Sequence, residues 1–479
     1  MAGLQNGNRD ARTLCPAGAK SKAWPGRVQG NFRGISRVRL TSVYGRMQNR
    51  LGELVSDQEN DRKRSPALQI KRCVVKGKSR IAILIPEFPG QTHSFFWREI
   101  EALHNYHGVE SKIISTRLPP KPVFHDWVSR ADAVHLYPIP AASFARIIPK
   151  FILSLPRLLS GSDTRRILKN PRSWAFALMA IRLADICKSA GLQHMHVHSC
   201  ANFATIAALC HRISGIPYSL VLHGALADYG ADQPFKWKDA SFVFIITETL
   251  RAEVAKILPD MMGKVVIVPM GVNTDIFRPP ETLRPDQPEP FMWFCCARLN
   301  RGKGYDTLIE AASLLRNQSQ ELNFKICIAG EDEQGGAGYH RELDALIVQN
   351  GLEGTIELMG SVTQETVRKK LQDADGFVLA SRHEALGVAY MEAMACGLPV
   401  IGTRTGGVPE LIKSEDNGIL VSPDSPGELA HAMAVLMRDP DLRHRLGQRA
   451  RSCILDNYSA RRSADALAQS LHKEGQESL

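Results

Sequence analysis

The sequence lacks apolar runs of bilayer-spanning length and lacks paired cysteine motifs. A transmembrane helix needs about 20 consecutive apolar residues, and no apolar run in the 479 residues comes near that length. The ten cysteines include no C-x-x-C pair, so neither a zinc site nor a disulfide scaffold is expected. The first 30 residues also lack the basic-then-apolar order of a secretory signal. Several cysteines lie in apolar segments, which indicates reduced core thiols of a cytoplasmic protein: Cys295, Cys296, Cys327 and Cys396.

Positive charge is concentrated at the start of the chain. The net charge is +11, but residues 1–79 hold 17 Lys and Arg against five Asp and Glu, whereas residues 289–479 are net acidic. Residues 1–78 are rich in Gly, Ser, Arg and Asn without sustained periodicity, so we predict a disordered basic extension. Such an extension is either a solvated tail or a contact to an anionic membrane surface. Nothing else in the chain resembles a nucleic-acid-binding module, so no nucleic-acid partner is expected.

Residues 79–276 alternate between strand and helix patterns. The first strand signal is Ile81 to Ile85, and helical spacing follows over residues 95–106. Near-continuous apolar strands with helices between them indicate a parallel sheet covered on both faces. Two apolar segments with basic residues, 151–161 and 173–187, are either core helices or helices on a membrane surface. Further strand signals are at 112–116, 195–199, 218–224, 242–248 and 265–271.

A Pro-rich segment then interrupts the alternation. Residues 277–290 contain five prolines and no periodicity, which is typical of an interdomain linker. The strand and helix alternation restarts over residues 291–455, and residues 456–479 are predicted to form a C-terminal helix and tail. The sequence therefore predicts an α/β protein with two tandem Rossmann-like, doubly wound domains. Ligands of such sheets bind at the carboxyl ends of the strands, and two facing sheets make a cleft.

A short basic motif follows the strand pattern MWFCCA. Arg298 and Lys303 stand five residues apart in RLNRGKG. Two cations on a Gly-containing turn at the end of a strand can converge on a diphosphate and offset the charge of a leaving nucleotide. Taken alone, the motif is more typical of a basic surface loop.

Two glutamates flank the start of a predicted helix. Glu384 and Glu392 occur in SRHEALGVAYMEAMACG, and we expect the helix to begin near Ala385. Its free N–H groups would then face a phosphate or a sugar oxygen. Glu392 lies about two turns along and can accept hydrogen bonds from ribose hydroxyls. Two glutamates at this spacing are usually solvated, but here another Gly-rich turn follows, at Gly406 and Gly407.

Two Asp-x-Asp pairs are candidates for a divalent ion. Asp373 and Asp375 lie where a helix pattern meets a strand pattern, and the second pair is in the turn at 439–441. We interpret both pairs as structural. Because Arg298 and Lys303 can meet the charge of a diphosphate, neither a metal nor another cofactor is predicted.

Taken together, these segments resemble the family-four retaining glycosyltransferases. The segments ARLNRGKGYDTLIEA, IAGEDEQG, ELMGSV, ADGFVLASRHEALGVAYMEAMACGLPVIGTRTGGVPELI and NGILVSP have the order and spacing of that family's C-terminal domain. The resemblance runs from Arg80 to Tyr458 and implies the GT-B fold, in which two Rossmann-like domains face each other across a cleft. EFPGQTHSFFWREIEAL and MHVHSCANFATIAALCHRISGIPYSLVLHG are similar to bacterial exopolysaccharide enzymes of the colanic-acid type. At 92–95, Thr-His-Ser-Phe replaces the Ser-Glu-Thr-Phe often found there.

The resemblance implies roles for the positions that match the family's motifs. The diphosphate of the donor is assigned to Arg298 and Lys303, and its ribose to Glu392. The transferred sugar is assigned to Glu384 and to the backbone of Ala385, Leu386 and Gly387. His223, which ends the segment YSLVLH, faces the transferred sugar from the N-terminal domain, and Gly90 allows donor or acceptor to approach the backbone closely. His223 and Glu384 would be catalytic, and the others would bind the donor.

The implied reaction is metal-independent, retaining transfer of a sugar from a nucleotide diphospho-sugar to an acceptor hydroxyl. The subfamily implies a saccharide or lipid-linked saccharide acceptor in exopolysaccharide biosynthesis, in the cytoplasm or at the inner face of the cell membrane. Two alternatives stay open: a GT-B nucleotide-sugar epimerase or hydrolase, and a catalytically silent nucleotide-sugar-binding protein. The joint presence of five residues argues against the silent protein: His223, Arg298, Lys303, Glu384 and Glu392.

Overall fold

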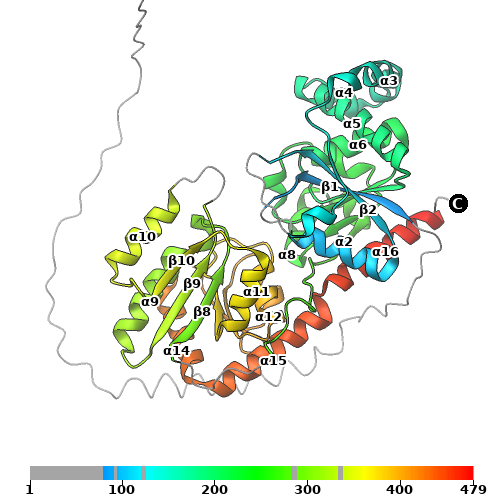
Figure 1. Ribbon diagram of the computed structural model, residues 1–479. Coiled ribbons are helices and arrows are strands. Elements are labelled where there is room, and N and C mark those ends of the chain that lie inside the picture. The colour runs from blue at the N-terminus through cyan, green and yellow to red at the C-terminus, as the bar shows by residue number, and fades with distance from the viewer. Residues whose placement is uncertain (1–78, 91–93, 120–125, 282–288, 333–337, 478–479) are drawn as a thin grey trace, which may run out of the picture. The chain divides into compact units, whose positions relative to one another are not determined.

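The computed structural model of the chain describes residues 79–90, 94–119, 126–281, 289–332 and 338–477 (Figure 1). All of these residues belong to one compact unit, Lys71–Leu479. The extension predicted at 1–78 lies outside the described residues, and so does half of the predicted linker, at 282–288.

The first sheet has seven parallel strands in the order β3-β2-β1-β4-β5-β6-β7. The order reverses between β1 and β4, which is where ligands bind in doubly wound sheets. The strands are β1 (Arg80–Glu87), β2 (Glu110–Arg117), β3 (Ala133–His135), β4 (His194–Val197), β5 (Tyr218–Leu222), β6 (Val243–Ile245) and β7 (Val265–Ile267). The helices of this part of the chain are α2 (Ser94–His107), α3 (Ala141–Ser160), α4 (Ser162–Leu168), α5 (Pro171–Ala190), α6 (Asn202–Ser214), α7 (Gln233–Lys238) and α8 (Glu248–Ile257).

Alternate residues of β1 enter two different cores. Ile83 and Ile85 belong to a cluster with apolar residues of α2 and of the last helix, α16 (Ala460–Glu477). Ala82 and Leu84 belong to a cluster with apolar residues of α5 and α6. Because successive side chains of a strand point to opposite faces, α2 with α16 covers one face of the sheet and α5 with α6 covers the other.

The second sheet has six parallel strands in the order β10-β9-β8-β11-β12-β13, with the reversal between β8 and β11. The strands are β8 (Phe291–Cys296), β9 (Phe324–Ala329), β10 (Ile356–Gly360), β11 (Gly376–Val378), β12 (Val400–Thr403) and β13 (Ile419–Val421). The helices that follow these strands are α9 (Tyr305–Gln318), α10 (Tyr339–Gln349), α11 (Gln364–Asp373), α12 (Val388–Ala395), α13 (Val408–Leu411), α14 (Pro426–Arg438) and α15 (Pro440–Asn457).

The last helix, α16, packs against α2 of the first sheet (Figure 1). Between α15 and α16, the N–H of Val272 donates to the carbonyl of Tyr458 at 2.9 Å, and the N–H of Ala460 donates to the carbonyl of Val272 at 2.9 Å. Nε2 of His107 on α2 lies 2.7 Å from Oδ1 of Asp465 on α16. Helix α16 therefore packs over the first sheet, together with α2.

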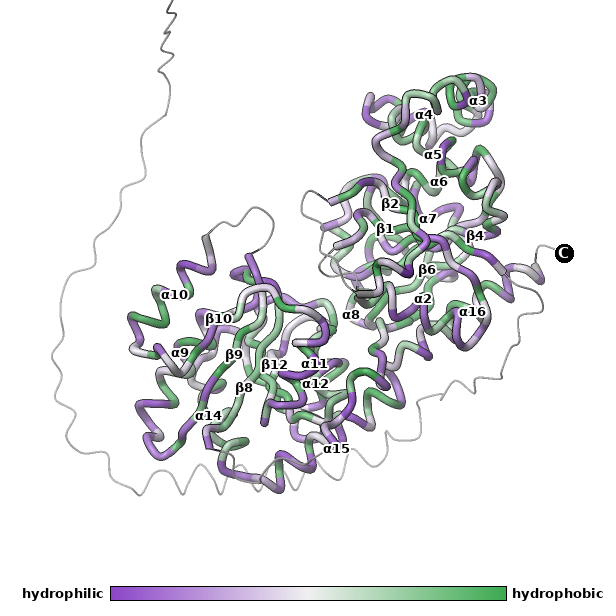
Figure 2. The backbone as a smooth tube through the Cα atoms, in the orientation of Figure 1, coloured by the Kyte–Doolittle hydropathy of each residue, from purple (hydrophilic) through white to green (hydrophobic). Residues whose placement is uncertain are grey.

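Hydrophobic residues are concentrated in the strands. Figure 2 shows β8, β9 and β12 mostly in green, whereas α10 and α15 carry purple, hydrophilic stretches. Among the described residues, no helix has both the length and the apolar character needed to cross a bilayer.

The prediction of two doubly wound α/β domains is confirmed, because each sheet is parallel, has the reversed strand order and is covered by helices. Strand β3 was not predicted, because its three residues, Ala133–His135, form no apolar run. The domain boundaries at 276, 290 and 455 stay predictions.

Candidate active site

One cavity of about 950 Å³ brings together most of the predicted site residues. It is lined by residues that follow β5 in the first sheet and by residues that follow β8, β11 and β12 in the second. Gly90, which comes after β1, is not among its lining residues, so the structure does not bring Gly90 to the other predicted site residues. The roles of all nine residues stay predictions. Those that line the cavity are His223, Arg298, Lys303, Glu384, Ala385, Leu386, Gly387 and Glu392.

Lys303 is positioned by a single 3-10 turn, Arg301–Lys303, after β8. Gly304 ends this turn with φ 65°, and a Cβ there would lie 1.9 Å from the carbonyl oxygen of Ala380. The N–H of Arg382 donates to the carbonyl of Gly302 at 2.8 Å, which ties the turn to the loop after β11. The close approach requires glycine at 304, because any other side chain would push these two loops apart.

Lys303 and Glu384 form an ion pair in the cavity. Nζ of Lys303 lies 2.5 Å from Oε2 of Glu384, and the two side chains are 15% and 14% exposed. The group predicted to hold the diphosphate and the group predicted to hold the sugar therefore neutralise each other. Arg301 on the same turn is 72% exposed and pairs instead with Glu342.

The loop that carries Glu384 is held by the glycine turn after β12. The N–H of Gly407 lies 3.3 Å from the carbonyl of Glu384 and 3.1 Å from that of Ala385. A Cβ on Gly406, at φ 51°, would lie 1.8 Å from the carbonyl oxygen of Glu384. Because these carbonyls are engaged by the glycine turn, α12 begins at Val388, so the expectation of a start near Ala385 was wrong. The N-terminus of α12 still opens into the cavity, whose lining includes residues 385–389.

Glu392 is paired with a cation that the sequence analysis missed. Nη2 of Arg98, on α2, forms a buried ion pair with Oε1 of Glu392 on α12. The Arg98 side chain is 2% exposed, and the ring of Phe277 lies 4.9 Å from its guanidinium carbon. Arg98 lines the same cavity. No local pattern signalled this contact, because the two residues lie on helices that belong to different halves of the fold and are 294 positions apart.

His223 reaches the cavity from the end of β5. Its ring lies edge-on to the rings of Phe95 and Phe96, at centroid distances of 5.2 and 5.7 Å. Nε2 of His223 is 3.2 Å from Nδ1 of His198. Burial, together with the neighbouring His198, lowers the pKa of His223 to about 3. The imidazole is therefore neutral at physiological pH.

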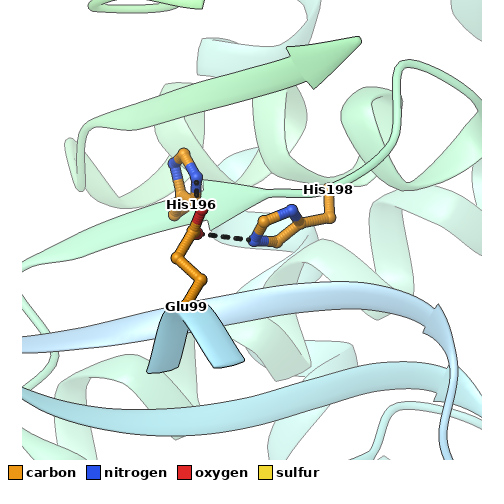
Figure 3. A group of neighbouring side chains, drawn as sticks. All are labelled: Glu99, His196 and His198. Carbon is orange, nitrogen blue, oxygen red and sulfur yellow. Dashed lines mark ion pairs between the residues drawn. The ribbon is translucent and has the colours of Figure 1, made fainter. Parts of the chain in front are cut away.

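A second group of titratable side chains is formed by Glu99, His196 and His198 (Figure 3), and His198 connects it to His223. Oε1 of Glu99, on α2, is 3.2 Å from Nε2 of His198 and 3.6 Å from Nε2 of His196. These three side chains are close enough together to share a metal ion. The sequence carried a signal for this group, because His194, His196 and His198 alternate along β4 and its end and so point to one face of the sheet.

Neither Asp-x-Asp pair lines the cavity. The side chain of Asp375 accepts a hydrogen bond from the N–H of Met292 at 2.8 Å. Asp439 caps α15, where its side chain accepts from the N–H of Leu442 at 2.8 Å.

The cavity thus combines groups suited to a polyanion with groups suited to hydroxyls. Two cations, Arg298 and Lys303, and the N–H groups at the start of α12 can bind phosphate oxygens. Glu384 and Glu392 can accept hydrogen bonds from sugar and ribose hydroxyls, and the neutral His223 can donate or accept one.

Comparison with known proteins leads to sugar-transferring enzymes. The family model for glycosyl transferases group 1 matches residues 281–452. A D-inositol 3-phosphate glycosyltransferase of Corynebacterium jeikeium is 30% identical over 43% of this chain and 50% of its own length. A putative colanic acid biosynthesis glycosyltransferase of Escherichia coli is 32% identical over 41% of this chain and 48% of its own length. The matched region thus spans about half the length of these curated relatives.

Solved structures extend the likeness to both sheets. The Anabaena protein HepE in complex with UDP-glucose superposes with a TM-score of 0.64 at 15% identity, over 82% of this chain and 99% of its own. Sucrose-phosphate synthase from Thermosynechococcus elongatus superposes with a TM-score of 0.63 at 18% identity, over 84% and 100%. At such identities the likeness concerns the fold alone, and it confirms the predicted GT-B fold.

Proposed function

We propose that this chain, which carries a group 1 glycosyltransferase domain at residues 281–452, moves a sugar from a nucleotide diphospho-sugar to an acceptor hydroxyl with retention at the anomeric carbon. The observation that carries the proposal is the single cavity of about 950 Å³ in which cations, carboxylates, a helix N-terminus and a neutral histidine meet. This volume lies within the usual range for small-molecule sites. Retention of the anomeric configuration is inferred from the resemblance to the family-four retaining glycosyltransferases.

The leaving group of this reaction is a nucleoside diphosphate, whose negative charge grows as the bond to the sugar breaks. Lys303 and Arg298 line the cavity beside the start of α12, so all three can offset that charge. A diphosphate competes with Glu384 for the ammonium group of Lys303, which is 2.5 Å away from that carboxylate. Once Lys303 has turned to the phosphate, Glu384 is available to hydroxyls of the transferred sugar. In this proposal no metal is needed.

The ribose of the donor is assigned to Glu392. Arg98 engages Oε1 of this carboxylate, which leaves Oε2 to accept a hydrogen bond from a ribose hydroxyl. Because Arg98 holds the Glu392 side chain in a buried ion pair, the carboxylate is oriented without a bound nucleotide.

His223 is the part of the site that comes from the first sheet. Its neutral imidazole contacts a hydroxyl near the reacting carbon, and the cavity closes around the sugar only when both sheets contribute. Closure also excludes water, which would otherwise compete with the acceptor hydroxyl.

The proposed acceptor is a lipid-linked saccharide. The surface of helix α3 supports the proposal that the enzyme acts at a membrane. Five of its apolar side chains are exposed: Phe144, Ile148, Ile152, Leu153 and Leu159. The same helix carries Arg146, Lys150 and Arg157, which suit anionic headgroups. Flotation with vesicles of phosphatidylglycerol and of phosphatidylcholine tests this part of the proposal. Binding to neither vesicle contradicts it, and binding only to the anionic one supports it.

The reaction is tested by a thermal-shift screen of nucleotide sugars that starts with UDP-glucose, followed by a transfer assay with the ligand that binds. At 100 times its dissociation constant a ligand adds about 2.7 kcal/mol to the unfolding free energy. The anomeric configuration of the product is read by proton NMR. Turnover without any acceptor would indicate an epimerase or hydrolase, and binding without turnover on any saccharide acceptor would indicate a silent binding protein.

A further inference from the structure

A continuous line of buried polar side chains runs from His223 to the last helix. His223 Nε2 is 3.2 Å from His198 Nδ1, and His198 Nε2 is 3.2 Å from Oε1 of Glu99. The other oxygen of Glu99 accepts a hydrogen bond from the hydroxyl of Ser463 on α16. The His198 and His223 rings are nearly parallel, 12° apart, at a centroid distance of 5.5 Å.

The line continues on the far side of Glu99. His196 Nε2 is 3.6 Å from Glu99 Oε1, and its Nδ1 is 2.7 Å from the hydroxyl of Ser219. That hydroxyl is also 2.8 Å from Nε2 of His194, whose Nδ1 is 2.7 Å from Oε2 of Glu474 on α16. Two carboxylates therefore contact this line of histidines, but only Glu99 lies next to the pair that ends at His223.

A buried carboxylate is costly unless charges and hydrogen bonds stabilise it. Burial alone would raise the pKa of Glu99, but His198, His196 and Ser463 outweigh it and lower this pKa to about 2. Glu99 is therefore an ionised hydrogen-bond acceptor at physiological pH. Such a group can dictate which nitrogen of a neighbouring imidazole carries the proton.

We propose that Glu99 and His198 are positioning residues that fix the ring orientation and the tautomer of His223 for the transfer reaction. The proposal rests on the proposed function for its catalytic consequence, but the hydrogen-bond arrangement that it assigns can be measured without turnover. Neither residue lines the cavity assigned to the sugar, so in the proposal both act through His223.

The proposed proton positions follow from the acceptor-only character of the ionised Glu99, whose Oε1 lies 3.2 Å from His198 Nε2. Nε2 is the nitrogen of His198 that faces the carboxylate, so in the proposed arrangement His198 carries a single proton, on Nε2. Nδ1 of His198 is then an acceptor and receives the N–H of Nε2 of His223. His223 is left with an unprotonated Nδ1, which has no hydrogen-bond partner among the described residues. In the proposal, this buried nitrogen is the one that accepts a hydrogen bond from a hydroxyl of the bound sugar.

A metal ion held by Glu99, His196 and His198 is the competing explanation of the same cluster. Structural zinc sites in proteins have four protein ligands, whereas catalytic zinc sites have three and a water. This set among the described residues has three, so the metal content of the purified protein decides between the two explanations. The small cavity beside it, about 10 Å³, is lined mostly by apolar side chains and has room for about one water molecule. The line of contacting polar side chains that ends at His223 accounts for the cluster without a further ligand.

The experiment measures the tautomer of His223 in protein labelled with ¹⁵N-histidine, with the His223 signals identified by their loss in His223→Gln. The expected wild-type result is a protonated Nε2 and an unprotonated Nδ1. In Glu99→Gln an amide N–H faces His198 and can reverse its tautomer, so the His223 signals should shift toward the opposite form or toward a mixture. His198→Asn removes the link to Glu99 in a second way and should have the same effect.

Steady-state kinetics and calorimetry complete the test. In Glu99→Gln the kcat should fall about tenfold to 100-fold, while the dissociation constant for the nucleoside diphosphate stays unchanged. The matched control is Glu474→Gln, which makes the same change at the other buried His–Glu pair and should alter neither kcat nor the His223 tautomer.

Several results would overturn the proposal. The first is a wild-type tautomer of His223 in both Glu99→Gln and His198→Asn. The second is an equal loss of kcat in Glu474→Gln, which would indicate a general structural role. The third is one equivalent of tightly bound metal in the purified protein that is lost in Glu99→Gln, since the cluster would then be a metal site. If the wild-type chain transfers no sugar, the proposed function fails, yet the tautomer measurement still decides the positioning role.

Discussion

Replacing Lys303 by alanine is the sharpest perturbation of the proposed diphosphate site. The Lys303 side chain lines the cavity and is 15% exposed, so its interaction with phosphate oxygens is only weakly screened by water. A preorganised cation that meets charge in such a site contributes about 2–4 kcal/mol to the transition state. We therefore expect kcat/KM of Lys303→Ala to fall roughly 30-fold to 1000-fold.

The same change also affects folding, because it leaves Glu384 without its partner at 2.5 Å. The cost should lie between the about 1 kcal/mol of an exposed pair and the 3–5 kcal/mol of a fully buried one. Denaturant titration of the variant gives this cost, and the kinetic assay is then run at a temperature at which the variant remains folded.

Arg301→Ala is the matched control. Arg301 stands two residues away on the same 3-10 turn, but its side chain is 72% exposed and pairs with Glu342 outside the cavity lining. Its loss should change stability by less than about 1 kcal/mol and should leave kcat/KM within roughly twofold. Equal losses of activity in both variants, or wild-type kinetics in Lys303→Ala, would refute the assignment of Lys303 to the diphosphate.

Three further outcomes are expected. Activity should survive EDTA, because cations on the chain are assigned to the diphosphate; loss on chelation with recovery in magnesium or manganese would contradict this. Glu392→Gln should weaken binding of the nucleoside diphosphate, whereas His223→Ala should bind it almost normally and transfer sugar poorly. Calorimetry beside a transfer assay separates the two effects. Loss of nucleotide binding in His223→Ala would contradict the assignment of His223 to the transferred sugar. Because burial, then His198, lowers the pKa of His223 to about 3 from the usual 6.5 or so, the unfolded chain binds more protons below about pH 6.5. The unfolding free energy should therefore fall as the pH drops, by about 2 kcal/mol from this group between pH 6.5 and 5, and His223→Gln should lose less; an unchanged pH slope in His223→Gln would contradict its neutral burial.

Local patterns in the sequence were enough to predict both sheets, apart from the short strand β3, and the loops that carry the charged side chains. Apolar runs such as Ile81 to Ile85 predict buried strands, and the segment RLNRGKG predicts the turn after β8. Both signals can be read locally, because strand periodicity and loop composition depend on neighbouring residues only. The start of α12 was misplaced by three residues, because contacts with Gly406 and Gly407 from another loop hold the preceding backbone.

Which charged groups meet was decided by the tertiary structure. Arg98 and Glu392 are adjacent only because α2 and α12, which pack in different halves of the fold, both contribute side chains to one cavity. Glu99 and His198 meet only because α2 covers the face of the first sheet to which the alternating histidines point, with Ser463 supplied by the returning α16. Residue type and spacing could identify these side chains as titratable, but their partners depend on strand order and helix packing, which bring together residues hundreds of positions apart.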